Sequence, residues 1–269
     1  MSDLPGHIDF ATAGCLVDLP PITLGEMDSI KLMNRVDTKY CTREDVLLNI
    51  LEEAGRHGYS VLEIDGARLT PYNSLYYDTD GLGMYRDHHN KRLVRQKIRT
   101  RVYVNSGTTF LEIKRKQNTG RTKKKRIQID PADFWDIASA GRAGEYGDFI
   151  AEYSKYTLQG IHPAMETIFS RITLVNDART ERITMDTGLR FVNHDTGADK
   201  DLGSAVIIEI KQDGRSHSEM KDILLDLRVK PLRVSKYCIG TALTNPAAPN
   251  HRFKVKIRAI EKTTNQKIC

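Results

Sequence analysis

Basic side chains recur along the chain in short segments of regular polarity, and their types suit the binding of phosphate oxygens. Arginine binds phosphate through two parallel hydrogen bonds, and lysine supplies a compact positive charge. The cations expected to hold phosphate are Lys39, Arg99, Arg101, Lys114, Arg171, Arg182 and Lys236. Four more, Arg35, Lys97, Lys116 and Lys211, lie in the same segments and are expected to contact the same ligand. The pattern predicts a site for a phosphate-rich anion.

Three carboxylates, Glu112, Asp186 and Glu209, lie in these segments too. Carboxylate oxygens suit a hard divalent cation whose other positions are filled by water and phosphate. Glu209 stands in the apolar run AVIIEIK and is hard to explain as a surface charge, whereas Glu112 and Asp186 are explained equally well as ion-pair partners. A metal combined with basic side chains is the arrangement that phosphoryl transfer requires.

The segment from Leu93 to Lys116 shows how these residues are positioned. Its charged and apolar residues alternate, with a turn signal at 105–107, which predicts a hairpin with two unlike faces. Like charges that face each other across a strand pair are destabilising. A polyanion lying on the cationic face is the simplest reason for such a pattern, and a merely exposed basic sheet is the alternative.

Further strands are expected at 34–40, 69–78, 167–175, 181–191 and 205–211, most with one charged and one apolar face. Helices are expected at 24–32, 42–55, 131–140, 146–158 and 219–227, and another begins near Ser235. Lys123, Lys124 and Lys125 form either a basic mouth for a polyanion or a solvated loop. The segment 251–258 alternates cations with apolar residues, as a last strand or a disordered basic tail would.

These elements predict an α+β fold. If the helices pack outside on the apolar faces, an antiparallel sheet that is closed or nearly closed encloses the charged faces in a tunnel. Such a lining is stable when it stays wet, forms internal ion pairs or binds a counter-charged ligand. We expect a lead-in with a short helix at 1–33, the tunnel domain at 34–245 and a basic tail at 246–269.

The composition is consistent with this site. The 269 residues carry a net charge of +6, which favours an anionic partner. No apolar run approaches the ~20 residues of a membrane span, and the N-terminus lacks a signal-peptide pattern. The four cysteines are scattered without a CxxC pair, which argues against a zinc site or a disulfide framework. We therefore expect a cytoplasmic protein.

Eight segments resemble, in order, a known family: RVDTKY, YYDT, KIRTRVY, FLEIKRK, SRI, RITMDTGL, VIIEIK and SKYCIG. Together they look like the polyphosphate polymerase domain of vacuolar transporter chaperone (VTC) proteins of the bacterial type, in the triphosphate tunnel superfamily. The resemblance extends from Asn34 to Gly240. It implies an eight-stranded antiparallel tunnel that transfers the γ-phosphoryl group of ATP to a growing polyphosphate chain, with Mn²⁺ or Mg²⁺ as cofactor.

The resemblance also implies roles for individual residues. Glu209 matches the family's metal-binding glutamate. The phosphate-binding positions match Lys39, the RxR pair Arg99 and Arg101, the ExK lysine Lys114, the later arginines Arg171 and Arg182, and the SKY lysine Lys236. Hydrolase relatives usually open with an ExExK strand. Here Arg35 replaces the first carboxylate, which favours the polymerase.

Two alternatives remain at this stage. A tunnel triphosphatase would use the same arginines with water as the acceptor, and a non-catalytic module would bind polyphosphate without turnover. Nucleic acid is a poor match, because base stacking needs aromatic residues on the cationic face and Tyr103 alone offers one. The expected partners are ATP and polyphosphate, and a separate membrane protein if the product crosses a membrane.

Overall fold

The computed structural model describes residues 8–30, 32, 35–214 and 216–268. Asn34, where the first expected strand and the expected tunnel domain begin, lies outside these residues, as do residue 31 of the expected first helix and residues 1–7 of the lead-in. No helix in the described part of the chain is both long enough and apolar enough to span a membrane.

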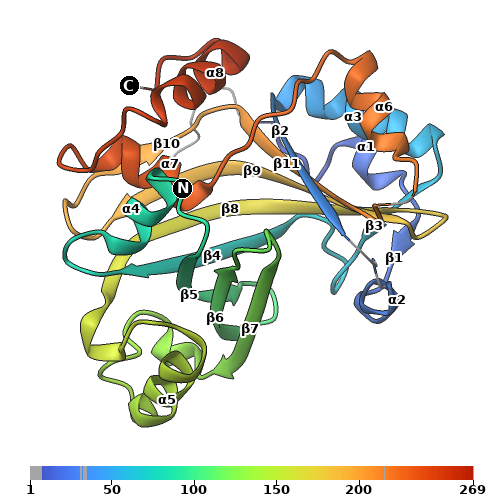
Figure 1. Cartoon of the computed structure of the whole chain (residues 1–269). Coiled ribbons are helices and arrows are strands. Elements are labelled where there is room, and N and C mark those ends of the chain that lie inside the picture. The colour runs from blue at the N-terminus through green and yellow to red at the C-terminus, as the bar shows by residue number, and fades with distance from the viewer. Residues whose placement is uncertain (1–7, 31, 33–34, 215, 269) are drawn as a thin grey trace.

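A large, strongly curved sheet forms the centre of the molecule (Figure 1). Its main path joins eight strands, and every neighbouring pair on it is antiparallel. In spatial order these are β2 (Val36–Arg43), β11 (Ala205–Gln212), β9 (Glu181–Asn193), β8 (His162–Asn176), β4 (Thr70–Asp78), β5 (Arg95–Tyr103), β6 (Thr109–Lys116) and β7 (Thr122–Ile129). The expected α+β class and antiparallel architecture are confirmed.

Three short strands extend the sheet beyond the expected eight. β1 (Pro21–Ile22) pairs in parallel with β3 (Tyr59–Leu62), which pairs with β8, and β10 (Asp199–Asp201) pairs with β9. β2 and β7 end the main path, and no pairing joins them among the described residues. Instead, the segment before α7 covers β2, where Leu232 donates its N–H to the carbonyl of Lys39 at 2.8 Å.

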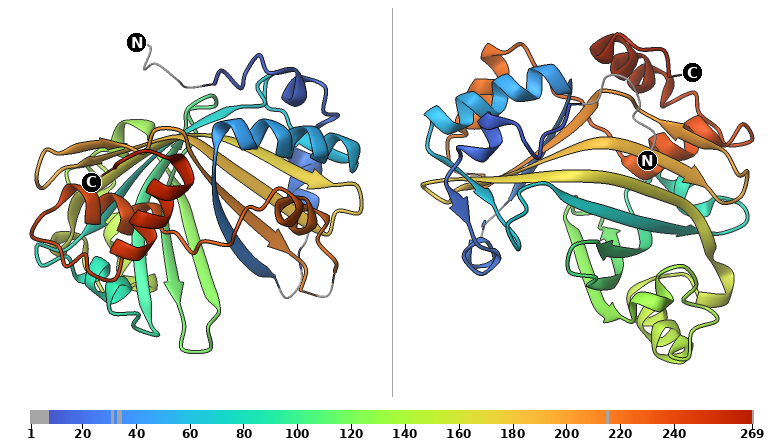
Figure 2. Two further views of the ribbon diagram at one scale, coloured as in Figure 1. Left: turned by 90° about the horizontal axis from the view of Figure 1, so that it is seen from above. Right: turned by 180° about the vertical axis from the view of Figure 1, so that it is seen from behind.

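The helices are grouped at three places around the sheet (Figures 1 and 2). α1 (Gly14–Val17), α3 (Glu44–Arg56) and α6 (Glu219–Asp226) lie together at one end, with α2 (Leu24–Ser29) below them in Figure 1. α4 (Gly83–His89), α7 (Lys236–Thr244) and α8 (Lys254–Thr264) gather at the other end. α5 (Ala143–Tyr153) lies beside β5–β7, together with the 3₁₀ turns Pro131–Phe134 and Leu158–Gly160.

Two apolar cores confirm that helices cover the apolar side of the strands. Ile208 and Ile210 of β11 belong to a buried cluster with Leu47 of α3. Ile98 of β5 belongs to a second cluster with Ile150 of α5. Side chains alternate along a strand, so Glu209 and Arg99 lie on the opposite side, which we call the inner face.

A third core closes one end of the inner face. Gly188 has a φ of +57° at a bulge between β8 and β9, and the shift in register moves Leu189 and Phe191 to the side that carries Asp186. Phe191 packs against α7 at Gly240, where an added Cβ would lie 2.9 Å from the ring. The inner face is therefore charged at one end and apolar at the other.

Three local expectations were wrong, and one helix was missed. Residues 251–258 are neither a strand nor a disordered tail, because most of them lie in or beside α8. Lys123–Lys125 belong to β7, so the alternative of a solvated loop is wrong, and the basic mouth stays a prediction. The helix expected at 131–140 is only a 3₁₀ turn, because the Asp136 carboxylate accepts the N–H groups of Ala138 and Ser139. Helix α4 was not expected at all.

Candidate phosphate-binding site

Most of the cations expected to hold phosphate lie on the inner face, brought there by strands far apart in sequence. On β5 and β6, the cross-strand pairs Arg99–Glu112 and Lys97–Lys114 fix the register. On β8, β9 and β11, Arg171 lies opposite Asp186 and Lys211 opposite Arg182. Lys39 of β2 lies opposite Glu209 of β11. Lys236, the first residue of α7, reaches the same face by its contact with Asp186.

Arg99 and Glu112 form a buried ion pair between β5 and β6. The Arg99 guanidinium donates to Glu112 Oε2 from Nε at 2.8 Å and from Nη2 at 2.5 Å, and its Nη1 donates to the hydroxyl of Tyr76 at 2.8 Å. Lys124 of β7 pairs with the other Glu112 oxygen. Burial opposes the charged carboxylate, but these cations hold the pKa of Glu112 far below its usual value.

Arg171 and Asp186 form a second, bidentate pair between β8 and β9. Nε and Nη2 of Arg171 donate to the two Asp186 oxygens at 2.6 and 2.9 Å, and the Lys236 ammonium donates to one of them. Burial lowers the pKa of Lys236 to about 8, with Asp186 opposing this and Arg171 adding to it. Lys236 also lies 4.6 Å from the centre of the Phe169 ring.

Glu209 is held by lysines rather than by a guanidinium. Lys39 Nζ lies 3.1 Å and Lys211 Nζ lies 3.6 Å from Glu209 Oε2. Burial favours the neutral acid, but Lys211 and Lys39 hold the pKa of Glu209 well below its usual value. The Glu209 side chain is 21% exposed, whereas those of Glu112 and Asp186 are 0% and 2% exposed.

Arg101 and Lys114 have no carboxylate partner among the described residues. Arg101 is buried, donates to the Ser74 hydroxyl at 2.8 Å and lies over the ring of Tyr72 at 5.3 Å. Burial and then Arg99 lower the pKa of Arg101, and Arg99 followed by burial lowers that of Lys114. These two cations are held in an environment that disfavours their charge, so an anionic ligand would stabilise them.

The remaining expected residues are less central. Arg182 donates to the carbonyl of Met27, which ties β9 to α2. Lys97 donates to the Ser235 hydroxyl at 2.7 Å. Lys116 is half-buried at the end of β6. Arg35 is exposed just before β2 and pairs with Asp37 at 2.6 Å. Of these four, Arg35 is exposed and the other three are partly buried.

A family model described as the VTC domain matches residues 34–245. The chain belongs to the VTC domain family. No curated protein sequence matched it. Among solved structures, a candidate adenylyl cyclase from Hippeastrum, described as having a dominant triphosphatase activity, is similar at 12% identity and a TM-score of 0.50, over 79% of this chain and 98% of that one. A candidate adenylate cyclase from Bacillus halodurans has 11% identity and a TM-score of 0.47, over 76% and 96%.

The VTC domain therefore has the triphosphate tunnel fold, as expected. The three carboxylates expected to bind metal, however, do not gather into one set, because the described residues contain no cluster of three or more His, Cys, Asp or Glu side chains that could hold an ion. Glu112 and Asp186 are fully engaged with guanidinium and ammonium groups and do not fit a metal. Glu209 fits as a single carboxylate ligand, since Mg²⁺ commonly takes one or two protein carboxylates and completes its shell with water and substrate phosphate.

Three residues of the VTC domain were not assigned to the inner face from the sequence. Tyr76, Ser74 and Lys124 contact Arg99, Arg101 and Glu112 respectively. Tyr76 and Ser74 alternate along β4, so period-two reasoning applied to LTPYNSLYYD would have placed both on one face with Tyr72. Lys124 was considered as part of a basic mouth or of a solvated loop, and not of a strand, because GRTKKK lacks the apolar residues that mark a strand.

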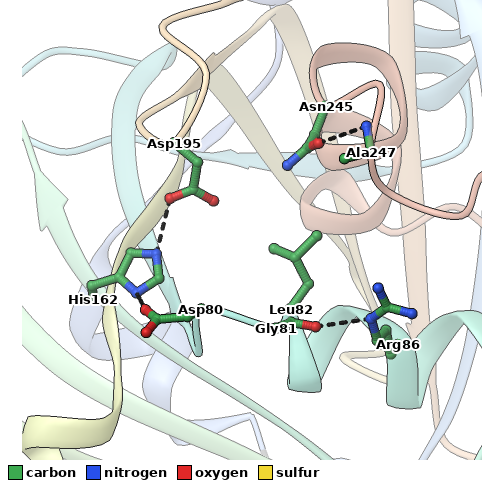
Figure 3. A pocket seen from close by; sticks show the side chains of 8 residues that line it. All are labelled: Asp80, Gly81, Leu82, Arg86, His162, Asp195, Asn245 and Ala247. Carbon is green, nitrogen blue, oxygen red and sulfur yellow. Dashed lines mark hydrogen bonds and ion pairs between the residues drawn. The ribbon is translucent and has the colours of Figure 1, made fainter.

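A pocket elsewhere in the VTC domain contains none of the expected residues (Figure 3). His162 lies between two carboxylates there, with Nδ1 3.2 Å from Asp80 and Nε2 2.9 Å from Asp195. Arg86 of α4 lies across the pocket and donates to the carbonyl of Gly81. Its groups are paired with one another, in contrast to Arg101 and Lys114 on the inner face.

Proposed function

We propose that the protein is a polyphosphate polymerase, which transfers the γ-phosphoryl group of ATP to the end of a growing polyphosphate chain bound on the inner face. The observation that carries this proposal is the uncompensated charge of Arg101 and Lys114. Arg99, Arg171 and Lys39 on this face have carboxylate partners, whereas Arg101 and Lys114 have none among the described residues. A bound triphosphate supplies the missing negative charge, and VTC family membership supports the choice of ligand.

The reaction requires positioning and charge neutralisation more than covalent chemistry. A terminal oxygen of the chain attacks the γ-phosphorus of ATP, the bond from that phosphorus to the β-bridging oxygen breaks, and ADP leaves. Arg101 and Lys114 stabilise the negative charge on the transferred group, while the Arg171–Asp186 pair keeps Lys236 directed to the inner face. Mn²⁺ or Mg²⁺ bound to Glu209, phosphate and water would neutralise further charge.

The alternative is a tunnel triphosphatase, in which water replaces the polyphosphate end. The Hippeastrum protein with a similar fold is described as a triphosphatase, and the same cations serve either reaction. The first strand favours the polymerase. Its Asp37 is exposed and paired with Arg35, so this end of β2 offers no second carboxylate beside Glu209.

The test is incubation of the pure protein with γ-labelled ATP and Mn²⁺, followed by separation of the products by gel electrophoresis. A ladder of labelled polyphosphate together with ADP is the expected result. Label released only as free phosphate would instead establish the triphosphatase. ATP that binds without conversion would instead support a non-catalytic binding module. Arg190→Ala, which removes a surface ion pair with Asp199 on the outer side, is the matched control and should behave like the unmodified protein.

A further inference from the structure

Six cations lie beyond the phosphate-binding site at the end of β5 and β6, and we call them the outer cation cluster. They come from four parts of the chain: the turn after α4, the paired strands β5 and β6, the segment before α7, and α8. The members are Lys91, Arg95, Lys97, Lys116, Arg233 and Lys256. Lys97 and Lys116 were expected to contact substrate, whereas the other four were not among the expected site residues.

The cluster continues the line of charge along β5. Residues on one side of a strand recur about every 7 Å, so Arg101, Arg99, Lys97 and Arg95 form a row that leads outward from the site. Across the hairpin, Lys97 pairs with Lys114 and Arg95 with Lys116. Cations directly opposite each other destabilise a sheet. Two such pairs in succession are costly to the folded protein unless an anion lies over them.

No member of the cluster forms an ion pair with a carboxylate in the described part of the chain. Arg95 donates to the carbonyl of Arg92 at 2.6 Å, and Lys97 donates to the Ser235 hydroxyl at 2.7 Å. Lys256 lies 5.7 Å from the centre of the Phe253 ring. These contacts orient the side chains without neutralising them. Elsewhere on the surface, arginines such as Arg43 and Arg142 are paired with acidic neighbours.

The members are also close enough to act on one another. Arg95, then burial, then Arg233 lower the pKa of Lys116. Burial is the main cause of the lowered pKa of Lys256, and Arg233, Lys91 and Lys97 contribute to it. The mutual effects join α8 and the segment before α7 to the β5–β6 end as one electrostatic unit. Nearby His88 adds no charge, because burial and then Lys97 and Arg95 lower its pKa to about 2.

We propose that the outer cation cluster is a second binding region for a linear polyphosphate chain, which holds the phosphate units that extend beyond the inner-face site. The inference rests on the proposed function for the identity of the anion. The cluster suits a flexible chain of repeated negative charges because its cations are spaced along a row and come from separate elements. None of the six members is aromatic and could stack on a base, so the cluster does not suit a single-stranded nucleic acid.

The test compares two double variants that each remove two positive charges. Arg233→Ser with Lys256→Ser removes cluster members that lie outside the strands, and Lys254→Ser with Lys262→Ser removes two exposed charges from α8 as the control. Affinities for tripolyphosphate and for long-chain polyphosphate are measured at several salt concentrations, without ATP. For the cluster variant, long-chain affinity should fall about tenfold with a shallower salt dependence, while tripolyphosphate affinity stays within about twofold. The control should change neither.

Two outcomes would overturn the inference. Equal weakening for both ligands would assign these cations to the triphosphate site, and unchanged long-chain affinity would mean that they bind no part of the chain. Thermal melting of each variant confirms that both remain folded. The binding assay needs no turnover, so its result is separate from that of the labelled-ATP assay. If the labelled-ATP assay shows hydrolysis and the cluster variant still loses long-chain affinity, the second binding region is supported and the polymerase is excluded.

Discussion

Arg101 is the most informative single residue of the site. Arg99 and Arg171 are partners of buried carboxylates, so their removal would leave Glu112 or Asp186 buried with less compensation, at a cost of about 3–5 kcal/mol for a broken buried pair. A loss of binding in those variants would be confounded by a loss of stability. Arg101 has only the Ser74 hydroxyl as its polar partner among the described residues.

We therefore predict that Arg101→Ala weakens tripolyphosphate binding about tenfold to a hundredfold, because a charge-assisted contact contributes roughly 1.5–3 kcal/mol. Calorimetry would measure the affinity, and thermal melting would show a smaller loss of stability than in Arg99→Ala. Ser74→Ala is the matched control, since it removes the partner of Arg101 but not the charge. Unchanged affinity in Arg101→Ala would remove Arg101 from the site.

Glu209 distinguishes catalysis from binding. Glu209→Gln removes the carboxylate that we expect to hold the metal and also removes a negative charge beside Lys39 and Lys211. We predict that turnover of γ-labelled ATP is lost, while tripolyphosphate binding without metal is unchanged or tighter. Asp199→Asn, which neutralises an exposed carboxylate, should retain full activity. An active Glu209→Gln protein would exclude Glu209 as the metal ligand.

The charge of Lys236 predicts a pH dependence. Its pKa is lowered to about 8, so the ammonium is present below that pH and lost above it. Tyr76 changes in the same range, since Arg99, Lys97 and Arg101 outweigh burial and lower its pKa to about 8. Deprotonation of Lys236 removes a positive charge, and that of Tyr76 adds a negative one. Both changes weaken the binding of an anion as the pH rises through 8.

The measurement is tripolyphosphate affinity between pH 6 and 10 for the unmodified protein, Lys236→Arg and Tyr76→Phe. Lys236→Arg should bind relatively better above pH 8, because arginine stays charged. Tyr76→Phe should remove the part of the decline in affinity that comes from the ionisation of Tyr76. Ionisation of the ligand is common to all three proteins, so it cancels when they are compared at each pH. If affinity depends on pH in the same way for the three proteins, Lys236 and Tyr76 do not cause the decline.

At the scale of the elements, Asp78 connects three of them. Its buried carboxylate at the end of β4 accepts the N–H groups of Met84 and Tyr85 in α4 at 2.7 and 2.9 Å. It also accepts the hydroxyl of Tyr237 in α7. Leu82, which precedes α4, has a left-handed backbone conformation and provides no side-chain cap, so Asp78 provides the anion at this helix N-terminus.

This arrangement predicts that Tyr237→Phe lowers the free energy of unfolding by roughly 1–3 kcal/mol, because it removes a hydrogen bond to a buried charged group. It should also weaken tripolyphosphate binding by a smaller amount, since Tyr237 follows Lys236 at the start of α7. Tyr85→Phe, whose hydroxyl donates to the carbonyl of Pro249, is the control and should affect stability alone. Urea unfolding and calorimetry would check both effects.

The elements that could be predicted from the sequence are those whose apolar period was visible within one segment. The hairpin β5–β6 and strand β11 alternate strictly, and each was expected with its correct inner face. In the segment 251–258 the apolar residues Phe253, Val255 and Ile257 also alternate, yet Phe253 and Ile257 are buried and Val255 is 74% exposed. The helical spacing becomes clear only when Ile260 is included.

The ion-pair partners of the charged side chains were harder to predict than the face of the sheet on which these side chains lie. The sequence identified Glu112, Asp186 and Glu209 as inner-face carboxylates, but their separation depends on which strands are neighbours. β8 pairs with β9, so Asp186 lies opposite Arg171, and β5 pairs with β6, so Glu112 lies opposite Arg99. Each carboxylate is therefore next to an arginine and not next to another carboxylate. Strand order is a tertiary property that alternation does not encode. A shared metal site was therefore expected where separate ion pairs occur.

At the scale of the whole molecule, the charged inner face depends on three apolar cores. Two of them lie outside the sheet beneath α3, α5 and α6, and the third lies at one end beneath α4, α7 and α8. The third core contains Phe253, Ile257, Ile260 and Ile268 from the segment that was expected to be a separate tail. The same core contains Tyr237, which adjoins Lys236, a residue proposed to bind phosphate.

The C-terminal segment should therefore be necessary for folding. Burial of an apolar side chain stabilises by about 1.5–3 kcal/mol, so loss of all four would remove about as much as the ~5–15 kcal/mol that typically separates the folded and unfolded states. Deletion of residues 250–269 should leave an unfolded or aggregated protein. A milder and more exact test is Ile257→Ala, which should lower the free energy of unfolding by about 2–5 kcal/mol.

Val255→Ala is its matched control. Val255 is in the same helix but is 74% exposed, so its truncation should change stability by less than ~0.5 kcal/mol. Because the α8 core also supports α7, Ile257→Ala should in addition weaken tripolyphosphate binding through a less ordered Lys236, whereas Val255→Ala should not. Equal stability of the two variants would mean that α8 does not pack on this core in solution. A destabilised Ile257→Ala protein with normal affinity would show that Lys236 is positioned by its own contact with Asp186 and not by the core behind it.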